Sequence, residues 1–280
     1  MSDFEYYKQK IERHIERKRR EREAPKTPRP REQPPTTNNQ SAGRSFFLGD
    51  EFGKKIHQKV IDKYGQFPAI SCVVYDEDGK VAKGSTPFYV SAVNEFLPEG
   101  IRTASQADLE RILKNDELKL EGQWEDTSLV LRSAQDPNKY LAQDLYKQFS
   151  SRGISLNEGI PIVIPLFGTR LRTDDNSPYK LTFDLIDSPV YFEAPILNEP
   201  SLRKFDSSDI DESTGLPKTV KDKGQRTLYT RNFDGYNLKN SGLSGLLLNG
   251  HLVVESNSEY FQYSSSDGRV VLVAAEGSVL

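Results

Sequence analysis

Apolar positions at intervals of three and four residues predict four helices along the chain. The first covers residues 4–23, where a narrow apolar stripe lies among charged residues, and we expect a solvated helix. The others are predicted over residues 50–64, after Ser105 and after Pro137. Ser105 is expected to cap its helix together with Asp108, because an acidic residue three positions after a Ser completes an acidic variant of the capping box.

Apolar runs between turn signals predict the strands. Residues 69–75 and a second run toward residues 88–90 flank an Asp-Gly turn, which favours a hairpin. Residues 159–167 read as a buried strand, and residues 179–192 as one or two more. Residues 197–225 are polar and predict a long, mobile excursion between elements.

The chain divides into a tail and one folded domain. Residues 1–23 form the charged N-terminal helix, and residues 24–44 contain five prolines and no large apolar residue, which predicts a disordered linker. The remaining residues, 45–280, alternate helices and strands. We therefore expect one α+β domain there.

The composition argues against several classes of function and indicates none directly. The net charge of −3 offers no basic field for nucleic acid, and no apolar run is long enough for a membrane span. No secretory signal is visible, so a cytoplasmic location is the default expectation. Cys72 lies in an apolar run and reads as a structural thiol, and the three histidines lack metal-ligand spacing. We expect no enzyme activity and no cofactor.

Acidic clusters and one tryptophan complete the list of candidate chemistry. Residues 174–176 and 206–211 read as solvated loops, because neither matches the ligand spacing of a calcium loop, although calcium is left open. Trp124 is expected in the core, and nothing in the sequence places its neighbours Glu121 and Glu125 in a common pocket.

The C-terminal segment has the composition of a binding surface. Residues 232–267 contain seven Ser, five Asn, three Tyr, two Asp and four Gly, with leucines between them. Antibody combining loops favour the same residue types, because Tyr gives contact area and Ser and Asn give adaptable hydrogen bonds. The turns Asn249-Gly250 and Asp267-Gly268 predict hairpins, and the leucines with residues 270–273 are expected to form the scaffold. Ordinary hairpins with polar loops are the alternative interpretation.

Three stretches of this segment carry a family resemblance: RTLYTR at 226–231, SGLSGL at 241–246, and SSSDGRVVLV at 264–273. Residues 226–276 resemble the variable region of target proteins of diversity-generating retroelements, as found in candidate-phylum bacteria and small archaea. LPEGIR at 97–102 resembles the opening of the first helix of their C-type-lectin-like fold, which formylglycine-generating enzymes share. Oxidase chemistry of that kind would need cysteines that this chain lacks.

The resemblance implies a C-type-lectin-like domain that binds ligands through a diversified C-terminal face. Adenine-specific mutagenesis of Asn codons would produce the Ser, Tyr, Asp, Gly and His found here, whereas Lys239, Glu255, Glu259 and Gln262 fit that origin less well. The ligand would be a protein or a glycan. The alternatives are a carboxylate-based hydrolase and an assembly protein that self-associates through residues 4–23. The predicted contact residues are Asn232, Asp234, Tyr236, Asn237, Asn240, Ser241, Asn249, His251, Asn257, Glu259, Tyr260, Gln262, Tyr263 and Ser265.

Overall fold

The protein is described by a computed structural model, which covers residues 42–76, 78–231, 240–264 and 266–278. These residues form a mixed α+β domain, as predicted. The predicted helix at 4–23 and residues 24–41 of the linker lie outside the described residues. The first strand, β1 (Ala42–Phe47), begins before the predicted start of the domain at residue 45. No helix among the described residues is both long and apolar enough to cross a membrane.

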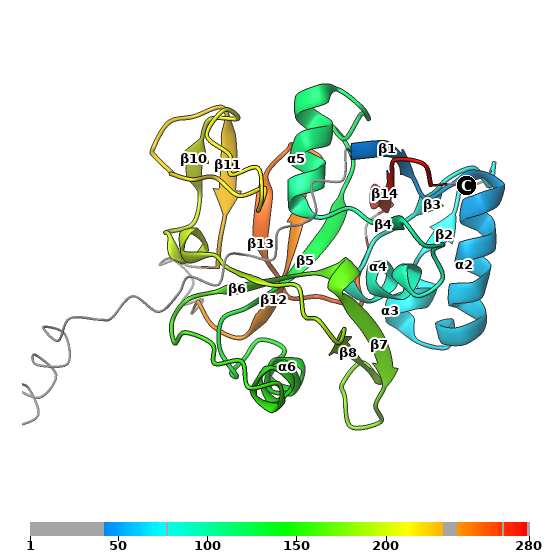
Figure 1. Cartoon of the computed structure of the whole chain (residues 1–280), viewed down its shortest axis with the longest axis horizontal. Helices are drawn as coiled ribbons and strands as arrows, with labels where there is room; N and C mark the ends of the chain where they lie inside the picture. The colour runs from blue at the N-terminus through cyan, green and yellow to red at the C-terminus, as the bar shows by residue number, and fades with distance from the viewer. Residues whose placement is uncertain (1–41, 77, 232–239, 265, 279–280) are drawn as a thin grey trace, which may run out of the picture. The chain divides into compact units, whose positions relative to one another are not determined.

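A curled seven-stranded sheet lies at the centre of the domain (Figure 1). Its neighbouring strands are antiparallel, except β11 and β13, which run parallel. Every residue of β5 (Glu125–Leu131) and of its neighbour β12 (Leu243–Leu248) is buried. In spatial order the strands are β10 (Arg203–Phe205), β11 (Arg226–Tyr229), β13 (Val254–Ser258), β12 (Leu243–Leu248), β5 (Glu125–Leu131), β6 (Ile162–Pro165) and β9 (Phe192–Glu193).

One face of the curled sheet packs against α5 (Gln106–Asn115). Leu109 and Ile112 are fully buried in one apolar cluster with leucines of β12. The predicted capping box is confirmed: the Ser105 hydroxyl accepts from the Asp108 N–H at 3.2 Å, and the Asp108 carboxylate accepts from the Ser105 N–H at 2.8 Å. Because these bonds satisfy two donors at the helix start, they fix where α5 begins.

Ser105→Ala is expected to lower the free energy of unfolding by about 1 kcal/mol, because it removes the hydroxyl that caps α5. Urea denaturation followed by circular dichroism measures the change. Ser208→Ala, at an exposed position, is the matched control. Equal unfolding midpoints for the two variants would show that the cap contributes nothing.

The opposite face is covered by α4 (Pro87–Asn94), with α2 (Asp50–Tyr64) and α3 (Pro68–Ser71) beside it (Figure 1). The bounds of α2 are those predicted from periodicity. The strands predicted at residues 69–75 and 88–90 are largely wrong, since α3 and α4 occupy most of these positions.

The sequence contains the reason for both errors. Pro68 and Pro87 each occupy the first turn of a helix, where the missing N–H is not needed. Thr86 caps α4 by accepting from the Tyr89 N–H at 3.0 Å. The predicted hairpin survives only as two short strands around the Asp-Gly turn, β2 (Val74–Tyr75) and β3 (Ala82–Lys83).

A second, three-stranded sheet has the order β1, β14 (Val271–Ala275) and β4 (Ile101–Thr103). Residues 271–273 of the predicted scaffold stretch 270–273 therefore lie in a strand. The Asp267-Gly268 turn does not form the predicted hairpin, because β14 pairs with β1 and β4 while Gly268 bridges to Trp124. Trp124 itself is only partly buried.

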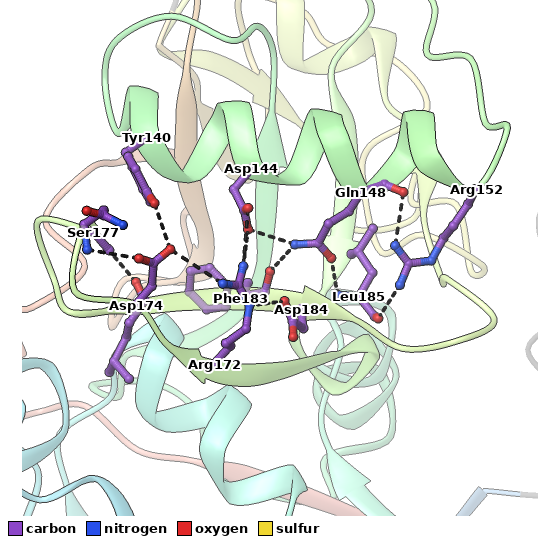
Figure 2. Close-up of polar contacts among 12 residues, drawn as sticks. Tyr140, Asp144, Gln148, Arg152, Arg172, Asp174, Ser177, Phe183, Asp184 and Leu185 are labelled. Atoms are coloured by element: carbon purple, nitrogen blue, oxygen red, sulfur yellow. Dashed lines mark hydrogen bonds and ion pairs between the residues drawn. The ribbon is translucent and has the colours of Figure 1, made fainter.

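The helix α6 (Lys139–Ser151) is clamped to a hairpin of β7 (Thr169–Thr173) and β8 (Leu181–Leu185) by polar side chains (Figure 2). Gln148 donates to the Phe183 carbonyl at 2.7 Å and accepts from the Leu185 N–H at 2.8 Å. These bonds join the helix directly to the β8 backbone. The short 3-10 turns η1 (Leu166–Gly168) and η2 (Pro195–Asn198) follow β6 and β9.

The polar stretch 197–225 is tied to the sheet and to itself. It contains β10, and Lys204 and Lys221 exchange two backbone hydrogen bonds at 2.8 Å. Asp211 accepts from the backbone N–H groups of Ser213 and Thr214 at 2.9 and 3.1 Å and so closes its own turn. The predicted excursion thus carries a strand of its own.

Candidate ligand-binding surface

Most of the predicted contact residues that the structure describes lie near one or the other end of the hairpin formed by β12 and β13. Its register pairs Leu248 with Val254 near the turn and Gly245 with Ser258 near the open end. Asn249 and His251 therefore lie at the turn, while the residues before β12 and after β13 lie at the open end. Five predicted contact residues fall outside the described residues: Asn232, Asp234, Tyr236, Asn237 and Ser265.

At the turn, Asn249 builds the backbone and does not present a free side chain. Its side-chain oxygen accepts from the N–H groups of His251 at 2.9 Å and Val253 at 3.1 Å, and its amide donates to Glu255. This is the usual role of Asn in a turn. The side chain of His251 is exposed beside it.

At the open end, several predicted contact residues are engaged in bonds within the protein. The Asn240 amide donates to the side chain of Asn198, and the Ser241 hydroxyl donates to the Asp136 carbonyl at 2.8 Å. Glu259 forms an ion pair with Arg231 at 3.3 Å. Asn257 is partly buried on β13, and its side-chain oxygen has no hydrogen-bond partner among the described residues.

Residues 259–264 form the most exposed aromatic segment of this end. Tyr260 and Tyr263 are 72% and 79% exposed, and Gln262 between them is exposed as well. Phe261 points the other way and is fully buried. Its ring lies about 6 Å from those of Phe88, Tyr179 and Phe183, in the core beneath α4.

Polar contacts hold this segment, which we call the tyrosine segment (259–264), at both of its ends. Asn138 donates one side-chain bond to the Glu259 carbonyl and another to the Leu243 carbonyl, each at 3.0 Å. The Ser264 hydroxyl accepts from the Ser85 N–H at 2.6 Å. With Phe261 as an anchor in the core, the two tyrosines are presented from a fixed backbone.

This arrangement of fixed backbone and exposed tyrosines suits recognition of a partner. The chain matches no family model, no curated protein and no solved structure. Its function therefore has to be inferred from the geometry of its own residues.

The predicted scaffold of the C-terminal segment is confirmed where the structure describes it. Leu243, Leu246 and Leu248 are fully buried in β12, and residues 270–273 are at most 8% exposed. Leu252, in the turn, is partly buried and packs against the same core. Buried leucines thus carry the strands whose ends display the polar residues.

Two consecutive carboxyl groups, Glu125 and Asp126, are buried on β5. From the sequence, Glu125 was considered only as a neighbour of Trp124, and Asp126 was not considered. Glu125 is 2% and Asp126 6% exposed, and neither Glu125 oxygen has a hydrogen-bond partner in the part of the chain that the structure describes. Burial, with the nearby Asp126 charge, raises the pKa of Glu125 to about 9. Burial likewise raises the pKa of Asp126 to about 6. The available signal was two consecutive acids at the start of an otherwise uncharged strand.

These two acids do not form a convergent catalytic pair. As consecutive strand residues they leave opposite faces of the sheet. Asp126 has Ser85 and Cys72 nearby, whereas Glu125 has Arg269. Burial also raises the pKa of the Cys72 thiol, which favours its unreactive protonated form.

In the two acidic loops that were considered for calcium binding, carboxylates are engaged by side chains of the protein. Asp174 accepts from the Tyr140 hydroxyl at 2.8 Å and lies 3.6 Å from an Arg172 nitrogen (Figure 2). Asp206 pairs with Lys221. Within the described ranges, no group of three or more His, Cys, Asp or Glu residues could hold a metal ion.

Proposed function

We propose that this protein is a non-catalytic binding protein that contacts a protein or glycan through the tyrosine segment and the neighbouring ends of the β12–β13 hairpin. The observation that carries the proposal is the alternation at 260–263, where exposed tyrosines flank a fully buried phenylalanine. A tyrosine held in this way loses little conformational entropy on binding and offers a large contact area.

We further propose that the surface is diversified, as the resemblance to retroelement target proteins implies, and that the domain is a relative of the C-type-lectin-like fold. The hydrogen bonds of the site support a division of labour. Asn249, Asn240 and Ser241 maintain the backbone, while His251, Tyr260 and Tyr263 are free to change. A substitution at an exposed position on a fixed backbone changes which ligand the surface binds and leaves the fold intact.

The alternative of a carboxylate hydrolase has less support, because the two buried acids of β5 do not meet at one point. The alternative of assembly through residues 4–23 concerns residues that the structure does not describe, and it is compatible with a binding role for the domain.

Comparison of the coding sequence and its flanking DNA among related isolates tests the proposal. We expect substitutions at positions 251, 260 and 263, a constant Phe261, whose codons contain no adenine, and a neighbouring reverse transcriptase with a near-copy of the segment that differs at adenines. Gln262 is an internal control. It is exposed, like the tyrosines, but its codon cannot arise from an Asn codon by changes at adenines alone when the third base is a pyrimidine.

Adenine-directed diversification therefore predicts variation at 260 and 263 with little at 262. Ordinary neutral drift at an exposed surface predicts similar variation at all three positions. A segment that is invariant among isolates, with no near-copy beside it, would overturn the proposal of a diversified surface.

A further inference from the structure

Two arginines are buried at the open end of the curled sheet. Arg132 directly follows β5 and Arg231 lies two residues beyond β11, and each is only 5% exposed. The strands β5, β11 and β13 run in the same direction, so their C-terminal ends lie along one edge of the sheet. Both guanidinium groups therefore belong to this edge.

Arg132 is held in place by hydroxyl groups and not by an acid. Its guanidinium donates to Ser244 Oγ at 2.7 Å, to Ser256 Oγ at 2.9 Å and to the Ser256 carbonyl at 3.0 Å. Its Nε has no hydrogen-bond partner among the described residues. No carboxylate of the described ranges lies within ion-pairing distance of it.

Among the described residues, Arg231 forms an ion pair with Glu259 at 3.3 Å, and its Nε lacks a hydrogen-bond partner there. The Glu259 side chain is 31% exposed, so solvent screens part of that attraction. Burial, together with the positive charge of Arg231, lowers the pKa of Arg132 to about 9. The two cations are thus close enough to repel each other.

Burying a charge is unfavourable unless an opposite charge and hydrogen bonds compensate for it. Among the described residues, these two guanidinium groups face one partly solvated carboxylate, which leaves an excess positive charge and unused N–H donors in this part of the structure. Neutral side chains could fill the same space at lower cost. The arrangement therefore suits a second negative group that approaches the same edge.

We propose that Arg132 and Arg231 form a binding site for a carboxylate group of a ligand. Guanidinium groups match the planar geometry of carboxylates, and the ends of curled sheets are common places for ligand sites. Glu259 occupies part of the site in the free protein and competes with the ligand. The site is separate from the proposed function of the tyrosine segment and touches it only through Glu259.

The test uses the full chain and acetate as the probe, with chloride at the same ionic strength as the reference. Two-dimensional ¹⁵N NMR observes the arginine Nε–H groups. We expect the signals of Arg132 and Arg231 to shift saturably with acetate, while exposed Arg170 serves as a control that does not shift. Inorganic phosphate and sulfate, tested in the same way, show whether the site prefers carboxylates to other oxyanions.

Two variants separate binding from a structural role. Glu259→Gln removes the competing carboxylate at a partly exposed position, and we expect it to tighten acetate binding by about tenfold. Arg231→Gln should abolish saturation, and Arg170→Gln should leave it unchanged. If Arg231→Gln does not fold, the Glu259→Gln result still decides, because arginines with only a structural role predict no change in anion affinity.

Acetate shifts equal to those of chloride, or an unchanged affinity in Glu259→Gln, would overturn the inference. Replacing Tyr260 and Tyr263 together by Ala should leave acetate binding intact. Failure of the tyrosine segment as a recognition surface is thereby distinguished from failure of the arginine site.

Discussion

Replacing Glu125 by glutamine is expected to increase the free energy of unfolding at pH 7 by ~3 kcal/mol. The wild-type carboxyl is 2% exposed, makes no hydrogen bond among the described residues and has a pKa raised to about 9. It must therefore take up a proton when the protein folds at neutral pH. Glutamine has the same shape and needs no proton, so the folding penalty of the acid disappears.

The direction of the pH dependence follows from the same shift. Between the unfolded pKa of Glu125, near 4.5, and its folded pKa of about 9, the folded state holds a proton that the unfolded state has lost. Stability therefore falls as the pH rises through this window, by up to about 1.4 kcal/mol per pH unit. Asp126, with a pKa of about 6 against 3.8, adds to the slope between these values.

Other carboxyl groups act in the opposite sense at lower pH. Asp108, beside Arg102 and within the capping box, and Asp211, in its own turn, have lowered pKa values in the fold. The stability that they contribute is present above their unfolded pKa, near 3.8, and is lost as the pH falls through the lower folded pKa. The wild-type protein is thus expected to be more stable at pH 5 than at pH 8.

Urea denaturation from pH 2 to pH 9 checks this expectation. Glu125→Gln should flatten the decline between pH 5 and pH 9 and leave the acidic limb unchanged. Glu121→Gln, at an exposed position a few residues before Trp124, is the matched control and should follow the wild-type curve. A variant at Glu125 that retains the full wild-type slope would show that this carboxyl is ionised in the fold.

Local signals in the sequence were sufficient for several elements. The periodicity of residues 50–64 and the Ser105–Asp108 capping box each lie within one helix, and both predictions are confirmed. Leu243, Leu246 and Leu248 were expected in the scaffold and are buried in the single strand β12. Such features depend on neighbours in sequence and are visible without the fold.

Other features depend on contacts between distant residues. Ala69, Ile70 and residues 88–90 are buried, and a short apolar run without alternation does not distinguish helix from strand. The pairing of β14 with β1 joins the two ends of the domain, which no turn motif indicates. Likewise, Glu125 owes its environment to residues far along the chain, so sequence alone could not show that it is unpaired.

Breaking the buried ion pair between Glu110 on α5 and Arg226 on β11 is expected to have the second large effect on the free energy of unfolding. Arg226 and Glu110 are 9% and 8% exposed at their side chains and form two charge-assisted bonds, one at 2.8 Å. Gln106 donates to the same carboxylate at 3.0 Å, and the guanidinium lies 5.1 Å from the centre of the Phe205 ring. The pair thus joins α5 to β11 of the curled sheet.

Glu110→Leu is expected to lower the free energy of unfolding by about 3–5 kcal/mol, because it leaves the Arg226 charge buried without an acidic partner. Arg226→Met should cost a similar amount by stranding the carboxylate. The double variant Glu110→Leu with Arg226→Met should recover most of the loss, since apolar residues of similar volume can replace a buried pair at little cost. The exposed pair Arg203–Asp222 provides the control through Asp222→Asn, which should have little effect.

A double-mutant cycle measured by urea denaturation separates the two contributions. A large coupling energy with recovery in the double variant would show that each single loss reflects a stranded charge. Additive losses would show instead that the two side chains stabilise the domain through separate packing contacts, Arg226 against Phe205 and Glu110 along α5. The attachment of α5 to the sheet would then depend on its apolar face, with Leu109 and Ile112 as the residues that hold it.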